Sequence, residues 1–251
     1  MHMNPIPRTI VPAALGIMLA ALALVACGKS PPAPVAATAA DEAATPAQPA
    51  AAAPSRADVD AGGLAGRSGT LNNPDNATMV FLYYDLAGIA PPIDQWVEAD
   101  QRVRYAPGAD KAALRSTVRA EYQAGLAAVR GVGVLQLTLQ AGLSSYDPTY
   151  GEFTVGALSP GAAYTFKAQE QTVSLSFDNA LNAQSWSVPK EQAQAIVDKI
   201  GSDPLLLDAT LRIRKVLPGP GGGTVVAHIE SWSLRDSRSG NTVARVNAIK
   251  P

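Results

Sequence analysis

The 251-residue sequence contains little of several residue types that would point to a particular chemistry. Its single cysteine excludes an internal disulfide framework and any cysteine-based metal knuckle. Two histidines, His2 and His228, leave little for a histidine-ligated metal site or a Ser-His-Asp arrangement. Charged residues make up only 16% of the chain, with 20 Lys and Arg against 21 Asp and Glu. Because nucleic-acid binding needs a basic face, this balance argues against a nucleic-acid partner.

Motifs for cofactor, metal or hydrolase chemistry are also missing. The chain has no G-x-S-x-G elbow for a nucleophilic serine. The glycine-rich segment 218–224 lacks the lysine and the following helix of a phosphate loop, so a flexible hairpin loop is predicted there. Asp198, Asp203 and Asp208 do not have the spacing of a calcium loop. We therefore expect no cofactor, no metal and no catalytic activity.

The first thirty residues have the pattern of an export signal. Arg8 supplies a positive charge, and an uncharged apolar stretch of about 17 residues follows over 10–26. This stretch is near the lower limit for crossing a bilayer, and it ends in small residues before the only cysteine. Leu24-Val25-Ala26-Cys27 resembles the lipobox of bacterial lipoproteins. The alternative is an ordinary signal peptide or a membrane anchor helix with an incidental cysteine.

The lipobox resemblance implies processing and anchoring. In that class of lipoproteins the chain is cut before the cysteine, so residues 1–26 are the expected signal peptide and Cys27 receives acyl chains such as palmitate. Two or three chains, at about 0.8 kcal/mol per buried CH₂, anchor a protein firmly. An aspartate after the cysteine retains such proteins in the inner membrane. Gly28 stands there instead, which favours the periplasmic face of the outer membrane.

Residues 27–70 are predicted to be a disordered tether that carries the lipidated cysteine. Over 31–54, 18 of 24 residues are alanine or proline, and the prolines recur too often for a long helix. The segment has almost nothing large and apolar to bury, and a glycine-rich stretch continues it over 62–66. As a random coil it would span roughly 35–40 Å. A wall-binding role for the Ala/Pro tract is the alternative to a solvated spacer.

Residues 71–251 have the composition of a globular domain. Apolar residues recur with helical spacing in three segments and alternate with polar residues in most of the others. The predicted helices are 92–105, a segment from Asp110 to before Gly131, and 189–200. The predicted strands are 79–86, 134–143, 153–157, 164–166, 173–177, 207–214, 224–235 and 242–249, with 153–157 and 164–166 forming a hairpin.

These segments predict a single α+β domain. Clean alternation indicates a sheet with one wet face, which antiparallel sheets allow. We therefore expect a mainly antiparallel, meander-like sheet with two N-terminal helices and one later short helix packed on it. In the strand 224–235, Trp232 has the opposite parity to Val225 and Ile229. A β-bulge near Glu230-Ser231 would bring all three to one face.

The segment 144–151 is the predicted partner-binding site. Tyr146 and Tyr150 flank an Asp147-Pro148 turn, so both rings could project from a tight, exposed corner. Tyrosine gives a large, rigid contact at a low entropic cost, which is why it is enriched at interfaces. The alternative is that both rings fold back over the end of the sheet as caps of the core.

His228 and Glu230 form a second candidate. They share strand parity and could touch, and a His-Glu pair can perform acid–base chemistry at neutral pH. The alternative is a polar pair on the solvated sheet face.

Several functions fit these features. The first is a membrane-anchored, non-catalytic interaction or scaffold module in the cell envelope, bound to an envelope protein or to the cell wall. The alternatives are a carrier of lipid or of a small apolar ligand, an envelope enzyme, and an immunity protein against an exported toxin. The near-neutral domain weighs against the immunity role, which calls for a charged patch complementary to an enzyme cleft.

Overall fold

In a computed structural model, residues 58–60, 62–201 and 204–247 can be described. The chain divides into two compact units, 1–51 and 52–251, and all described residues belong to the second. The predicted signal peptide, the lipobox with Cys27 and most of the predicted tether lie outside the described residues. In the part of the chain that is described, no helix is long and apolar enough to cross a membrane.

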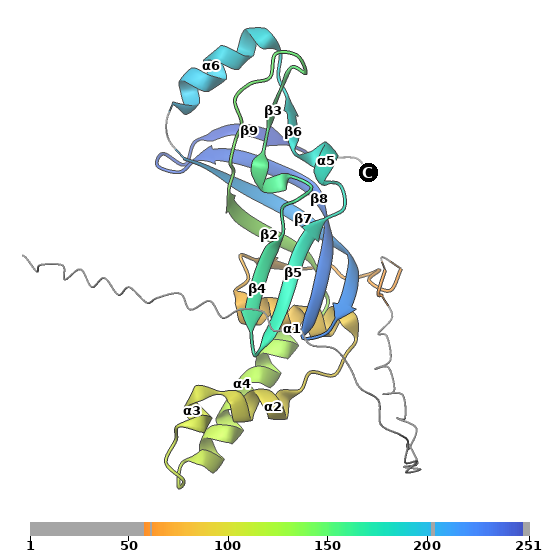
Figure 1. The fold of residues 1–251 in the computed structure, drawn as a ribbon, viewed down its shortest axis with the longest axis vertical. Helices are drawn as coiled ribbons and strands as arrows, with labels where there is room; N and C mark the ends of the chain where they lie inside the picture. The colour runs from red at the N-terminus through yellow and green to blue at the C-terminus, as the bar shows by residue number, and fades with distance from the viewer. Residues whose placement is uncertain (1–57, 61, 202–203, 248–251) are drawn as a thin grey trace, which may run out of the picture. The chain divides into compact units, whose positions relative to one another are not determined.

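The described residues form helices and strands that alternate irregularly along the chain (Figure 1). The first half contains β1 (Gly69–Asn72), α1 (Asn76–Ala87), α2 (Ile93–Ala99), α3 (Gln101–Arg104), α4 (Lys111–Ala128), β2 (Val132–Gln140), β3 (Glu152–Thr154) and a 3₁₀ turn (Gly156–Leu158). The second half contains β4 (Tyr164–Ala168), β5 (Gln171–Phe177), α5 (Ala180–Ala183), β6 (Ser185–Ser187), α6 (Lys190–Ile200), β7 (Leu205–Gly219), β8 (Gly222–Asp236) and β9 (Thr242–Val246).

A seven-stranded sheet with the order β1-β2-β7-β8-β5-β4 organises the fold. The hairpin of β7 and β8, 15 residues in each strand, lies at its centre. The first half of β8 also pairs with β5, and its second half pairs with β9. The strands β3 and β6 form a separate two-stranded sheet. The main core lies between α1 and the apolar face of the large sheet.

The α+β class is confirmed, but the antiparallel meander is not. The sheet is mixed, because β1 runs parallel to β2 and β5 runs parallel to β8. Parallel neighbours need long crossover connections. The chain supplies these with α1 to α4 between β1 and β2, and with α5, β6, α6 and β7 between β5 and β8. Alternation shows that one face is wet, and it does not report strand direction.

The segment 79–86, predicted as a strand, is part of helix α1. Seven of the twelve residues of α1 are buried, so apolar side chains lie on nearly every side of the helix and form no single stripe. A short apolar run of this kind cannot be assigned by its period. The ends define the helix instead: the Asp75 carboxylate accepts a hydrogen bond from the Thr78 N–H at 2.8 Å, and Gly88 closes the helix in the left-handed conformation.

Two further predictions change in detail. The helix expected over 92–105 is broken into α2 and α3 at Asp100. The hairpin expected between 153–157 and 164–166 is wrong, because β3 pairs with β6 and β4 pairs with β5. The turn between β4 and β5 is Gln169-Glu170, and both residues have positive φ angles, 47° and 60°. Such a turn matches the twist of a hairpin, but it contains no glycine from which the sequence could have predicted it.

The C-terminal half follows the sequence pattern closely. The helix 189–200, which stops at Gly201, is confirmed as α6. The β-bulge is confirmed as well: Thr210 pairs with Ser231, and the next residue, Leu211, pairs with Ile229. Glu230 is therefore the extra residue, and Trp232 joins Ile229 on the buried face.

The folded unit begins before residue 71. The backbones of Val59 and Val216 exchange two hydrogen bonds of 3.0 and 2.7 Å. Leu64 is buried in the main core, and β1 starts at Gly69, so the predicted boundary between 70 and 71 falls inside that strand. A glycine-rich composition does not reveal that a single apolar side chain and a few backbone groups join the fold.

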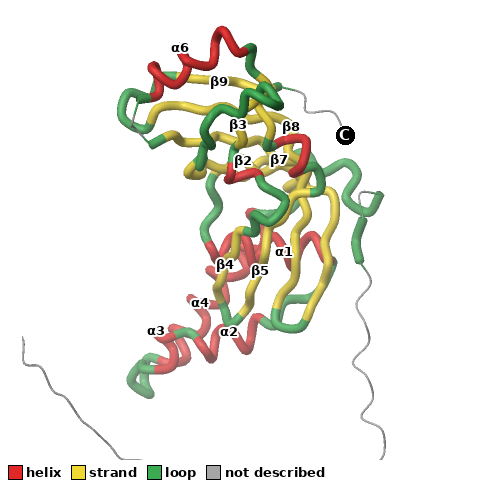
Figure 2. Tube along the Cα trace, turned by 45° about the horizontal axis from the view of Figure 1, so that its top comes forward, coloured by secondary structure: helices red, strands yellow, loops and turns green. Residues whose placement is uncertain are grey.

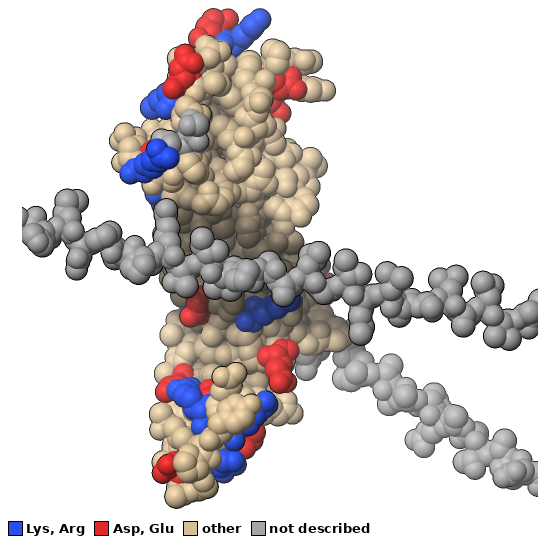
Figure 3. All heavy atoms as spheres, turned by 60° about the vertical axis from the view of Figure 1, so that its left-hand side comes forward, with Lys and Arg blue, Asp and Glu red and all other residues tan. Residues whose placement is uncertain are grey.

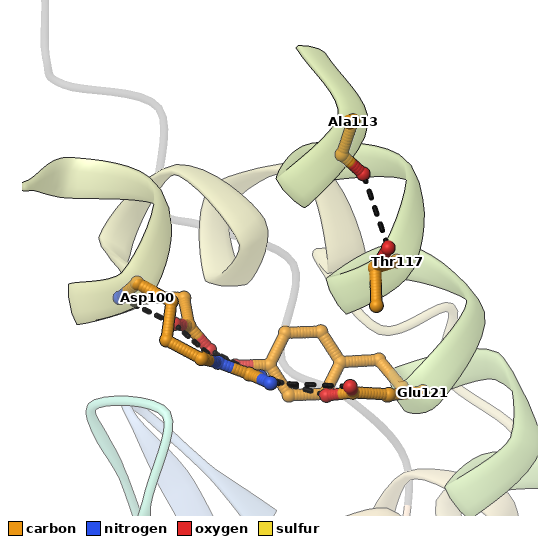
Figure 4. Close-up of polar contacts among 6 residues, drawn as sticks. Asp100, Ala113, Thr117 and Glu121 are labelled. Carbon is orange, nitrogen blue, oxygen red and sulfur yellow. Dashed lines mark hydrogen bonds and ion pairs between the residues drawn. The ribbon is translucent and has the colours of Figure 1, made fainter. Parts of the chain in front are cut away.

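Helices α2, α3 and α4 form a lobe at one end of the unit, and α6 lies at the other end (Figure 2). Arg102 joins α3 to α4 by contacting both Asp100 and Glu121 (Figure 4). Hydrogen bonds from Arg102 hold the pKa of Asp100 below its usual value, despite partial burial. Asp100 also accepts a hydrogen bond from the Tyr122 hydroxyl at 3.2 Å.

Candidate functional site

The predicted binding segment forms a rigid corner, here called the Tyr150 corner (residues 146–152). The Asp147 carboxylate accepts hydrogen bonds from the backbone N–H of Thr149 at 2.8 Å and of Tyr150 at 3.3 Å. The Asp147 carbonyl accepts from Gly151, whose φ is +69°. Asp147 and Glu152 also exchange backbone hydrogen bonds of 2.8 and 3.2 Å. The turn is therefore built on the Asp147 side chain, as is usual for aspartate in tight turns.

The two tyrosines of this corner have different environments. The Tyr146 hydroxyl donates to the Val188 carbonyl at 3.0 Å, and its ring lies 5.2 Å from that of Phe153. It thus packs against a small core cluster under α6. Tyr150 remains 76% exposed. The expectation that both rings behave alike is wrong, because only Tyr146 has an apolar cluster within reach.

This difference predicts separate effects on stability. Tyr146→Ala should lower the free energy of unfolding by about 2 kcal/mol, because it removes a hydrogen bond and part of an aromatic cluster. Tyr150→Ala should change it by less than about 0.5 kcal/mol, since the ring is in solvent. Urea unfolding followed by tryptophan fluorescence measures both variants. Equal losses would show that the two rings do not differ in packing.

A groove of about 610 Å³ adjoins the corner beside α6. It is called the α6 groove and is lined mainly by apolar side chains, with Gln140, Ser144 and Ser145 at its polar positions. Its apolar lining is Leu143, Tyr146, Phe153, Val197, Ile200 and Leu205. Val197 is 42% exposed, which is unusual for a residue on the apolar face of an amphipathic helix. The helix therefore leaves part of its apolar stripe uncovered.

His228 lies in a different environment from that predicted. Its side chain is buried, and Nδ1 is 2.8 Å from a carboxylate oxygen of Asp178. Nε2 is 3.3 Å from the side-chain nitrogen of Asn179. Because an amide nitrogen can only donate, Nε2 accepts and the Nδ1–H donates to Asp178. Asn179 also exchanges two hydrogen bonds with the backbone of Ile229, which fixes this arrangement.

Glu230 takes another partner. As the bulged residue of β8, it forms an ion pair with Arg212 on β7, and both side chains are partly exposed. The predicted candidates His228 and Glu230 are therefore each engaged by other residues, Asp178 with Asn179 and Arg212 respectively. Among the described residues, no group of three or more His, Cys, Asp and Glu side chains could hold a metal ion.

Sequence reasoning located the corner and missed the groove beside it. The sequence signal for the groove was the pair Val197 and Ile200 on the apolar stripe of α6. A short helix between two loops can leave part of such a stripe exposed. Comparisons of the chain with protein-family models, with curated protein sequences and with solved structures each found no match.

Proposed function

We propose that this protein is a lipoprotein of the bacterial cell envelope whose folded domain is a non-catalytic interaction module. Acylated Cys27 anchors it at the periplasmic face of the outer membrane. Its domain binds another envelope protein through the Tyr150 corner and the neighbouring α6 groove. The observation that carries this proposal is the exposure of Tyr150, 76%, on a turn held by its own hydrogen bonds.

The physical basis is the low cost of binding with a prearranged aromatic. A tyrosine on a rigid turn loses little conformational entropy when a partner covers it. The exposed Val197 and the apolar lining of the α6 groove add a recess into which an apolar side chain of the partner can fit. Interfaces concentrate their binding energy in such central aromatic and apolar contacts.

The distribution of charge also supports this face. In the view of Figure 3, charged side chains gather at the end of the unit formed by α2 to α4 and at the end that carries α6. On α6 itself the charges of Lys190, Glu191, Asp198 and Lys199 surround the apolar stripe. An apolar centre with a charged rim is the usual anatomy of a protein interface.

Site-specific photocrosslinking in intact cells tests the proposal. A benzophenone amino acid replaces Tyr150 in the full-length lipidated chain, and the matched control carries it at Tyr105, which is 77% exposed on the helical lobe. We expect one discrete protein adduct from position 150 and none of that size from position 105. Val197→Glu should reduce the adduct at least fivefold. The same adduct from both positions, or no adduct from position 150, would contradict the proposal.

Carriage of a small apolar ligand is a second candidate, favoured by the groove itself. Its volume of about 610 Å³ is within the range of roughly 300–1,000 Å³ that small-molecule sites occupy. Titration of the full-length protein with a fluorescent fatty acid distinguishes the two. Saturable one-to-one binding that Val197→Glu abolishes, together with no adduct from position 150, would replace the first candidate by the second.

A further inference from the structure

A second surface, on the solvent face of the sheet, is built almost entirely of uncharged polar side chains. The strands β1, β2, β7, β8 and β9 are neighbours in the large sheet. Their register places side chains in two adjacent rows across the strands. One row is Asn72, Gln136, Thr210 and Ser231, and the other is Thr138, Asp208, Ser233 and Arg245.

These rows line a groove of about 450 Å³, here called the polar groove, together with Asn73 and Asn247. Five strands at a spacing of about 4.8 Å make it roughly 19 Å long. Three apolar residues also border it, Leu137, Ala209 and Trp232, but each is at most 6% exposed because its side chain belongs to the core. The ligand-facing surface is thus made of hydroxyl, amide and a few charged groups.

One part of the polar groove is already ordered by hydrogen bonds. The Thr138 hydroxyl donates to Asp208 at 2.7 Å, and Arg235 donates to the other carboxylate oxygen at 2.7 Å. The Asn73 side-chain oxygen accepts from the Thr138 N–H at 2.7 Å. Burial raises the pKa of Asp208, but these hydrogen bonds and the Arg235 charge outweigh it, so the pKa stays below its usual value. Asp208 is therefore a fixed, ionised acceptor.

The other part offers groups that have no partner of their own. In the described part of the chain, the side chains of Gln136, Thr210, Ser231 and Ser233 make no hydrogen bond. Arg245 makes neither a hydrogen bond nor an ion pair with a described residue. Asp208 is paired with Arg235, so the guanidinium of Arg245, at the end of the same row, is a positive charge without a counterion among the described residues.

The composition of the polar groove selects one class of ligand. A nucleic acid would need many cations along the groove, and a lipid would need apolar lining. A protein interface would draw its energy from aromatic and arginine anchors, whereas serine and threonine are under-represented among them. A row of hydroxyl and amide groups instead matches a ligand with many hydroxyls, since both sides can donate and accept.

We propose that the polar groove binds a saccharide that carries a carboxylate, with its sugar hydroxyls on the row that contains Thr210 and Ser231 and its carboxylate at Arg245. The choice of a cell-wall sugar as the probe rests on the proposed envelope location. The site itself does not depend on the Tyr150 corner, so a failure of either proposal can be recognised separately.

The test measures binding of two disaccharides to the full-length lipidated protein in a detergent without a sugar headgroup. One is N-acetylglucosaminyl-N-acetylmuramic acid, which has a free carboxylate, and the other is diacetylchitobiose, which has none. We expect the acidic disaccharide to bind at least tenfold more tightly. Arg245→Gln should remove this difference. Thr210→Val with Ser231→Ala should weaken both sugars about tenfold, because two hydrogen bonds are lost.

Thr224→Val is the matched control for the threonine change, since Thr224 lies on β8 outside the polar groove and the substitution is the same as Thr210→Val. It should leave binding of both sugars unchanged, as should Tyr150→Ala. Absence of binding of either sugar at millimolar concentration would overturn the proposal. So would equal affinity of the two sugars for the unaltered protein, or an equal loss in the Thr224→Val control.

Discussion

Replacing Gly222 by alanine is expected to lower the free energy of unfolding by about 4 kcal/mol, one of the largest effects that a single methyl group can have. Gly222 has a φ of +141°, a conformation that other residues rarely adopt. A Cβ built there would overlap the backbone oxygen of Thr172 on β5. The Gly222 carbonyl also accepts a hydrogen bond of 2.6 Å from the buried Tyr83 hydroxyl. The backbone therefore cannot shift without disturbing β5 and α1 together.

Gly221→Ala is the matched control, one residue earlier in the same turn. Its φ is +66°, and a Cβ there would meet no atom within 4 Å. Only the cost of the left-handed conformation remains, about 1 kcal/mol. Urea unfolding followed by circular dichroism compares the two variants. Similar losses for both would mean that close packing at Gly222 is not what requires glycine there.

Replacing Cys27 by serine is expected to abolish acylation completely and to leave a precursor that is longer by the 26-residue signal peptide. This follows from the proposed lipobox, because in bacterial lipoproteins only the thiol of the cysteine receives the lipid. Membrane fractionation alone is a poor readout, because the uncleaved apolar stretch 10–26 could itself keep the chain in the membrane. Incorporation of a clickable palmitate analogue, together with the intact mass of the protein, measures both events directly.

Ser30→Ala is a suitable control for Cys27→Ser, since it changes a hydroxyl three residues away and leaves Leu24-Val25-Ala26-Cys27 intact. It should be labelled and cleaved like the unaltered protein. If Cys27→Ser retained the palmitate label, the proposed anchoring would be wrong, whatever the outcome at the Tyr150 corner.

Strand periodicity predicted β5, β7, β8 and β9 because each of these strands has one buried and one wet face, whereas α5 and β6 were not predicted. The bulge at Glu230 could be placed from parity alone, since Trp232 and Ile229 must both reach the core. Helix α1 could not be recognised from the period of its apolar residues, because its side chains are buried on nearly every side. Pairing partners were also out of reach: nothing local in β5 indicates that it runs beside β8, which lies more than forty residues later.

The candidate sites depend even more on long-range contacts. The turn at Asp147 could be predicted from its local sequence. The packing of Tyr146 could not, because it depends on contacts with Phe153 and Val188. Strand parity pairs His228 with Glu230, whereas its partners in the structure, Asp178 and Asn179, directly follow β5. The glycines at 221–223 looked like a flexible loop, and in fact Gly222 lies where two strands and a tyrosine converge.

The central position of the β7–β8 hairpin determines how early the core can form while the chain is being synthesised. The two central strands of the large sheet are among the last to be synthesised, ending at Asp236. Until they have emerged, β2 and β5 lack their central neighbours, and α1 has no complete surface on which to pack. During the proposed export, a translocation channel would therefore receive the chain before its core can form.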